Sequence, residues 1–156
     1  MYQKLVRWLR ILGYDTTFDT KYDDIDIIQI AKKENRIIVT RDEDLVHRGT
    51  KLGLQATKAD GKSIEERLLK LQKVTGIDLE LLDTTPSRCT VCNGSLKSIP
   101  KDEIIDKLQE GTKKQHQEFW ICTNEPCQQV FWKGPHWDKI KRTLDSCKEL
   151  SKTKAK

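Results

Sequence analysis

Helical and strand-like hydrophobic patterns alternate along the first half of the chain. Apolar residues at spacings of three and four predict helices near residues 4–12, 24–35, 43–49 and 64–76. Between them, short β-branched runs predict strands at Ile37–Thr40 and Leu54–Thr57, with a weaker candidate at Thr16–Phe18. This alternation predicts an α/β fold, in which helices flank a parallel sheet.

Residues that favour helix ends flank the predicted helices. Gly13 is a stop signal for the first helix, and Asp23 or Asp24 is an N-cap for the second. Gly49 is predicted to end the third helix. Ser63 and Glu66 form the sequence pattern of a capping box, which predicts the start of the fourth.

Four of the five cysteines form two close pairs in the second half of the chain. Two residues separate Cys89 from Cys92, and four separate Cys122 from Cys127. Two turns that each present two thiolates suit the tetrahedral coordination of Zn²⁺, and this spacing is typical of structural sites. Strand-like segments flank the second pair, as in a zinc ribbon. The sequence therefore predicts a structural zinc ion held by these four thiolates.

Alternatives to this zinc site remain open from the sequence alone. The two pairs could be reduced thiols or a redox-active disulfide, and His116 or His136 could replace one thiolate. Cys147 lies among lysines outside both pairs and is predicted to be a plain thiol. Four thiolate ligands leave no open coordination position, so the predicted metal is structural and not catalytic.

Acidic residues gather near the end of the most strongly predicted strand. Asp42 follows Ile37–Thr40 directly, Asp44 lies two residues further on, and Asp24 and Asp26 begin the preceding helix. Ligands of open parallel sheets bind at the carboxyl ends of strands, and clustered carboxylates favour hard cations such as Mg²⁺ or Mn²⁺. The same residues are also typical of helix N-termini, so their spacing leaves both interpretations open.

Composition limits the class of protein. The chain has 156 residues, of which 34% are charged and 36% hydrophobic, and a formal net charge of +5. The surplus lies mostly in a lysine tail, which predicts a solvated terminus or a weak attraction to nucleic acid. No apolar run is long enough for a membrane span and no signal peptide is visible, so we expect a cytoplasmic protein without a membrane partner. The oligomeric state is not indicated.

Six segments resemble the Mut-7 C-terminal RNase domain family, in the family's order and over nearly the whole chain. Their family counterparts are the GKLARWLRxLGYD signature, an acidic helix start, the RILLTRDRxL segment, and the RCxxCNGxL, EFWxC and VYWxGSHW elements of a zinc ribbon. The matching segments are Lys4–Asp15, Asp24–Ile28, Arg36–Leu45, Arg88–Gly94, Glu118–Cys122 and Val130–Trp137.

This resemblance implies a PIN-like nuclease domain at residues 1–84, a zinc ribbon at 85–146 and a basic tail at 147–156. It also implies RNA cleavage that depends on Mg²⁺ or Mn²⁺. Carried over by position, Asp42 and Asp26 would hold that metal, with Asp24 and Asp44 as second choices. The family's first strand, which carries a further carboxylate, has no counterpart in this sequence.

The leading functional hypothesis is a metal-dependent ribonuclease, with Arg7, Arg10 and Arg41 as candidate contacts to RNA phosphates. The tryptophans near the cysteines would either stack on bases or form the core of the ribbon: Trp120, Trp132 and Trp137. Two other hypotheses remain. One is a non-catalytic RNA-binding or ribosome-associated adaptor with a vestigial acidic cluster, and the other is a zinc-stapled protein-interaction domain.

Overall fold

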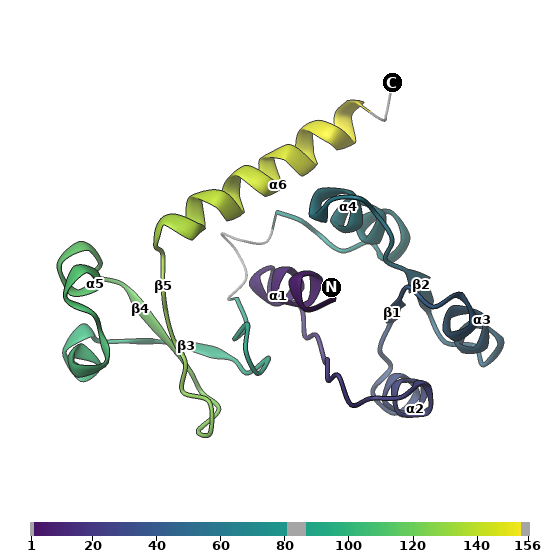
Figure 1. Cartoon of the computed structure of the whole chain (residues 1–156), viewed down its shortest axis with the longest axis horizontal. Coiled ribbons are helices and arrows are strands. Elements are labelled where there is room, and N and C mark those ends of the chain that lie inside the picture. The colour runs from purple at the N-terminus through teal and green to yellow at the C-terminus, as the bar shows by residue number, and fades with distance from the viewer. Residues whose placement is uncertain (1, 81–86, 154–156) are drawn as a thin grey trace. The chain divides into compact units, whose positions relative to one another are not determined.

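Contacts divide the chain into two compact units. The computed structural model describes residues 2–80 and 87–153. One unit is Phe18–Asp78, and the other joins Met1–Thr17 to Leu79–Lys156 (Figure 1). The first helix therefore groups with the cysteine-rich half of the chain. The domain boundary near residue 84 stays a prediction.

The Phe18–Asp78 unit contains the predicted parallel sheet. Strand β1 (Ile38–Thr40) pairs in parallel with β2 (Ala56–Lys58), and helix α3 (Glu43–Lys51) connects them. Helix α2 (Asp24–Glu34) precedes β1, and α4 (Ile64–Thr75) follows β2 (Figure 1). A core cluster forms between α2, β1 and α3, from Ala31, Ile38 and Leu45. The structure thus confirms a small parallel α/β sheet.

Most helix ends of this unit form as their local sequence predicts. Asp23 and Asp26 make a reciprocal capping box at the start of α2. At the start of α4, the Ser63 hydroxyl accepts a hydrogen bond from the Glu66 N–H at 3.2 Å. The Glu66 carboxylate accepts from the Lys62 N–H at 2.8 Å, so the cap forms without the reciprocal bond of the predicted capping box. Gly76 follows α4 with φ at +72°, a left-handed conformation that glycine adopts without steric cost.

The prediction that Gly49 ends a helix is wrong. Helix α3 continues to Lys51, and Gly49 is buried within it. A Cβ atom at this position would lie 3.2 Å from Ala56 Cβ and 3.2 Å from Ile38 Cδ1. Glycine is therefore used here because α3 packs closely on both strands, and not because the chain turns.

The second unit contains the ribbon. Helix α1 (Tyr2–Ile11) comes first, and three antiparallel strands form a sheet in the order β3 (Leu96–Ile99), β4 (Phe119–Cys122) and β5 (Val130–Trp132) (Figure 1). Two 3₁₀ turns, Lys101–Glu103 and Ile105–Lys107, and helix α5 (Glu110–Gln115) lie between β3 and β4. Ile104, Leu108 and Phe119 form the core of this part.

Two further expectations for this unit change. Thr16 and Thr17 form no strand, and neither does Phe18 of the other unit, so the weak candidate strand is absent. The predicted basic tail is helical for most of its length, because α6 spans Pro135–Thr153 and buries Cys147.

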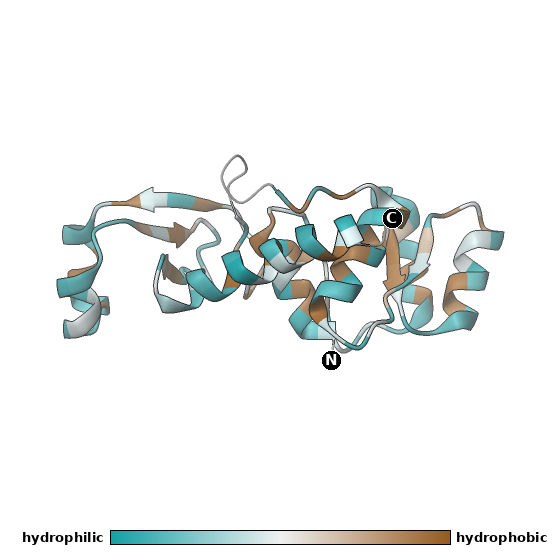
Figure 2. Ribbon diagram, turned by 90° about the horizontal axis from the view of Figure 1, so that it is seen from above, coloured by the Kyte–Doolittle hydropathy of each residue, from teal (hydrophilic) through white to brown (hydrophobic). Residues whose placement is uncertain are grey.

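Figure 2 shows polar and apolar residues alternating along the helices, as expected for helices at a surface. None of the helices in the described ranges is both long and apolar enough to cross a membrane.

Candidate functional site

The four paired cysteines converge on one point of the ribbon. One ligand atom from each of Cys89, Cys92, Cys122 and Cys127 lies within 4.8 Å of the other three. The Sγ atoms of Cys89 and Cys127 are 3.7 Å apart, and those of Cys92 and Cys122 are 3.4 Å apart. These separations are far longer than a disulfide bond of about 2.05 Å.

The cluster has the dimensions of a zinc site. Four sulfurs placed tetrahedrally at about 2.3 Å from Zn²⁺ are roughly 3.8 Å apart, close to the separations found here. His116 and His136 are not part of the cluster, and neither is Cys147. The four cysteines could therefore hold a zinc ion as the sequence predicted, with no coordination position left for a substrate.

Asn93 and Gly94, which follow Cys92 directly, allow the four sulfurs to lie close together. Asn93 adopts φ of +70°, which turns the chain sharply after the first pair. A Cβ atom on Gly94 would lie 2.8 Å from the Sγ of Cys122 and 3.3 Å from that of Cys92. Only glycine fits between these sulfurs, so Gly94 is required by the geometry of the site.

The thiols of the cluster differ in acidity. Burial raises the pKa of Cys122 to about 12 and raises that of Cys127 as well, and neighbouring thiols add to both effects. Burial also acts to raise the pKa of Cys92, but hydrogen bonds from the Gly94 N–H, the Asn124 side chain and neighbouring thiols lower it to about 6. Holding all four groups as thiolates therefore requires a compensating cation, and binding of the cation must release protons.

A buried arginine joins helix α1 to the first cysteine turn. Arg10 is only 6% exposed, and its Nη1 donates to the carbonyls of Thr90 at 3.0 Å and Val91 at 3.1 Å. Its Nε and Nη2 donate to the Thr16 carbonyl at 3.0 and 2.8 Å. Burial lowers the pKa of Arg10, whereas the sulfurs of Cys89 and Cys92 favour its charged form.

Asn93 makes a second connection to the same N-terminal segment. Its Nδ2 donates to Asp15 Oδ1 at 2.6 Å, and its Oδ1 accepts from the Thr16 N–H at 3.0 Å. The Ser87 hydroxyl also donates to the Ile11 carbonyl at 2.7 Å. The cysteine turn is therefore fixed from outside by a helix nearly eighty residues away in sequence.

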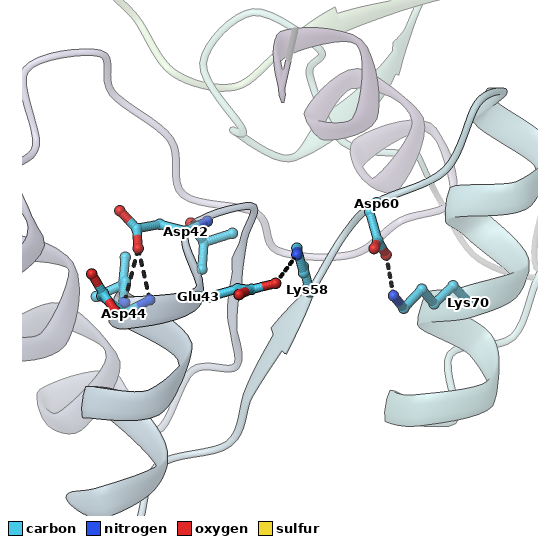
Figure 3. Close-up of polar contacts among 8 residues, drawn as sticks. Asp42, Glu43, Asp44, Lys58, Asp60 and Lys70 are labelled. Atoms are coloured by element: carbon cyan, nitrogen blue, oxygen red, sulfur yellow. Dashed lines mark hydrogen bonds and ion pairs between the residues drawn. The ribbon is translucent and has the colours of Figure 1, made fainter.

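Asp42 lies at the carboxyl end of β1 but is engaged in capping α3. Its Oδ1 accepts hydrogen bonds from the N–H groups of Asp44 at 2.8 Å and Leu45 at 3.2 Å (Figure 3). The other carboxylate oxygen points away from the helix in this view. The capping bonds fix the orientation of the side chain and leave that second oxygen facing outward.

Two of the other three predicted carboxylates also have local partners. Asp26 Oδ2 accepts from the Asp23 N–H at 3.3 Å within the capping box. Asp24 forms an ion pair with Arg48 at 2.9 Å. Asp44 lies in the first turn of α3 and, with Glu43, His47 and Lys58, lines a shallow surface depression. The structure thus places all four in one unit, but on two helix N-termini.

Asp60 is a further acidic residue at this edge of the sheet and was not predicted from the sequence. It lies two residues beyond β2, just as Asp42 lies two residues beyond β1, and the two strands are parallel. Its carboxylate forms an ion pair with Lys70 (Figure 3), and this hydrogen bond is the main cause that lowers the pKa of Asp60. The sequence does hold an indication of this position, because Asp60 follows the predicted strand Leu54–Thr57 much as Asp42 follows Ile37–Thr40.

We call the carboxylates of Asp24, Asp26, Asp42, Asp44 and Asp60 the acidic edge. They do not form a preassembled cluster like that of the cysteines. Within residues 2–80 and 87–153, the four cysteines are the one group of three or more Cys, His, Asp or Glu that could hold a metal ion. The catalytic roles of Asp26, Asp42, Asp24 and Asp44 therefore stay predictions.

The candidate RNA contacts have different environments. Arg7 is exposed and Arg41 is half-buried, and their proposed contacts with phosphate stay predictions. Arg10 lies three residues from Arg7 but is buried, and its donors are taken by carbonyl groups. This environment favours a structural role for Arg10 over contact with RNA. Trp132 packs on the core of the ribbon, whereas Trp120 and Trp137 both lie beside Lys133.

Comparison with known proteins gives the family. The model of the Mut7-C RNAse domain matches residues 1–144, which include both compact units apart from the end of α6. The chain belongs to the Mut7-C RNAse domain family. Membership suggests a ribonuclease-type function with RNA as the substrate. No curated protein and no solved structure matches the chain.

Proposed function

We propose that this Mut7-C domain protein is a metal-dependent ribonuclease that hydrolyses RNA phosphodiester bonds at the carboxyl end of the β1–β2 sheet. The observation that carries the proposal is the family match, together with Asp42 at the position where parallel sheets bind ligands. Mg²⁺ and Mn²⁺ are the expected ions. Mg²⁺ typically uses only one or two carboxylates and completes its coordination with water and substrate phosphate, so a large preformed cluster is not needed.

Asp42 is the strongest candidate ligand because its orientation is already fixed. The two N–H groups that bind Oδ1 leave Oδ2 available to a ligand, as Figure 3 illustrates. Asp26 is the proposed partner from α2, with Asp24 and Asp44 as second choices. A divalent ion held by these residues would supply activation of water and neutralisation of phosphate charge. Arg7 and Arg41 are proposed to contact neighbouring phosphates.

The decisive experiment compares Asp42→Asn with the wild-type protein on single-stranded RNA in Mg²⁺ or Mn²⁺. Asparagine is as good an N-cap as aspartate, so helix α3 should be retained while the anionic ligand is lost. We expect cleavage by the wild type and its loss in Asp42→Asn. Asp145→Asn, an exposed change on α6, is the matched control and should cleave normally. Cleavage by Asp42→Asn at the wild-type rate would refute the assignment.

A second candidate function is a non-catalytic RNA-binding adaptor. It is favoured by the partners that the acidic residues already have, because Asp24 pairs with Arg48 and Asp26 caps its own helix. An adaptor would bind RNA with a salt-dependent affinity but leave it intact after long incubation with Mn²⁺. RNA cleavage that depends on Asp42 would exclude this alternative.

A further inference from the structure

The two faces of the ribbon sheet are chemically different. Strand pairing places Ile99, Phe119 and Trp132 side by side, and this face packs on Ile104 and Leu108. Because successive residues of a strand point to opposite faces, the neighbouring row belongs to the other face. That row consists of Ser98, Trp120 and Phe131.

Lys133 completes this second face together with the start of α6. Its Nζ lies 5.6 Å from the centre of the Trp120 ring and 5.5 Å from the centre of the Trp137 ring. Both distances are within the range of cation–π attraction, which holds the ammonium group beside the two indoles. We define the aromatic face as Trp120, Phe131, Lys133 and Trp137. Its three aromatic residues are half-buried, and Lys133 is exposed.

The charge near the aromatic face favours an anionic partner. Residues 130–144 contain four basic residues and one acidic residue, Asp138. The basic residues are all exposed: Lys133, Lys139, Lys141 and Arg142. Lys141 lies four residues after Trp137, so both lie along the same side of α6. An aromatic platform with adjoining cations is the arrangement by which proteins bind single-stranded nucleic acids.

We propose that the aromatic face of the ribbon binds single-stranded RNA. Trp120 stacks on a base, with Trp137 and Phe131 as neighbouring stacking surfaces, and Lys133 pairs with the phosphate beside the stacked base. The aromatic face would then hold the RNA strand, while the proposed cleavage takes place at the β1–β2 sheet. This inference rests on the proposed function for its substrate class, but it concerns binding and not cleavage.

The test measures binding of a fluorescein-labelled twelve-nucleotide oligouridine by fluorescence anisotropy, with zinc-loaded protein and without added Mg²⁺ or Mn²⁺. Trp120→Leu should weaken binding by between about fivefold and a hundredfold, the range found when a stacking side chain is removed. Trp120→Phe should restore most of the affinity because it keeps an aromatic ring. A twelve-base-pair duplex should bind more weakly than the single strand, because its bases are already stacked on one another.

Lys133→Gln provides a second measurement that does not depend on the half-buried tryptophan. Loss of one phosphate contact should reduce the slope of log K against log salt by roughly 0.7. The matched control is Lys97→Gln, because Lys97 is also exposed but lies on the opposite face of the same sheet. This control should bind RNA with the wild-type slope. Zinc content and circular dichroism should be the same for all variants.

Each result separates this proposal from the proposed nuclease. RNA binding that is equal in the wild type, Trp120→Leu and Lys133→Gln would overturn the aromatic face even if the protein cleaves RNA. A folded, zinc-loaded protein that binds no RNA would also overturn it, and the face would then fit a protein partner better. Binding that depends on Trp120 and Lys133 would support the proposal even if no cleavage were found.

Discussion

The two candidate metal sites of this protein are built in opposite ways. In the ribbon, four sulfurs lie within 4.8 Å of one another, and Gly94 leaves just enough room for them. At the acidic edge, the carboxylates are spread over the starts of α2 and α3 and the segment after β2. There, Asp42 and Asp26 accept backbone hydrogen bonds and Asp24 pairs with Arg48.

This difference follows from what each side chain does without a metal. A buried thiolate has few favourable partners other than a cation, so the cysteine site would depend on a bound ion for stability. An exposed carboxylate can stabilise a helix N-terminus by itself, so the acidic edge keeps its structure without an ion. We therefore expect metal removal to unfold the ribbon but to leave the β1–β2 unit folded.

Cys92→Ser should give the largest effect on stability and is the strongest test of this contrast. Structural zinc contributes on the order of 10 kcal/mol to folding of small domains, as much as the whole stability of many proteins. We expect loss of zinc by elemental analysis and rapid hydrogen exchange over the ribbon, with residues 18–78 still protected. Cys147→Ser is the control, because Cys147 is buried but outside the cluster, and it should keep one zinc ion per chain. A folded ribbon without zinc would contradict the prediction.

Arg10→Ala should have an intermediate effect. It removes four hydrogen bonds from a buried guanidinium and leaves the carbonyls of Thr16, Thr90 and Val91 without that donor. We expect a loss of roughly 2–4 kcal/mol in the free energy of unfolding, measured in urea. Arg7→Ala, an exposed change one helical turn away, should stay within about 0.5 kcal/mol of the wild type. Similar losses in both variants would show that α1 is not held through Arg10.

Asp42→Ala should give the smallest effect on stability and tests the other site. Loss of the N-cap of α3 should cost about 1 kcal/mol, whereas Asp42→Asn should be nearly neutral. Thermal unfolding of the two variants side by side measures this difference. If Asp42→Asn were as destabilising as Asp42→Ala, the charge of the carboxylate would matter to the fold more than its capping bonds do.

Features set by neighbouring residues could be predicted from the sequence. The Asp23 cap, the Ser63 cap and the turn at Gly76 formed as expected, because these motifs depend on the few residues around them. The cysteine cluster was predictable for a related reason. Each cysteine pair is a local turn, and the two turns must come together to give four thiolate ligands for one metal ion.

Features set by distant contacts could not be predicted in the same way. In the sequence, Gly49 is indistinguishable from a residue that ends a helix. Only the structure shows that glycine is needed there because Ala56 of β2 packs closely against it. Arg7 and Arg10 are equivalent by spacing, yet only Arg10 faces the carbonyls of Thr90 and Val91. Sequence spacing could not assign the carboxylates of the acidic edge either, because the same pattern describes a helix cap and a metal ligand.

The docking of α1 on the cysteine turn has a consequence during synthesis of the chain. Arg10 finds its partners Thr90 and Val91 only after about eighty more residues have been translated, which takes roughly 4–16 s at common ribosomal rates. Until then, the Arg10 side chain lacks these two carbonyl acceptors of the folded protein. Docking of α1 through Arg10 therefore has to follow synthesis of the first cysteine turn.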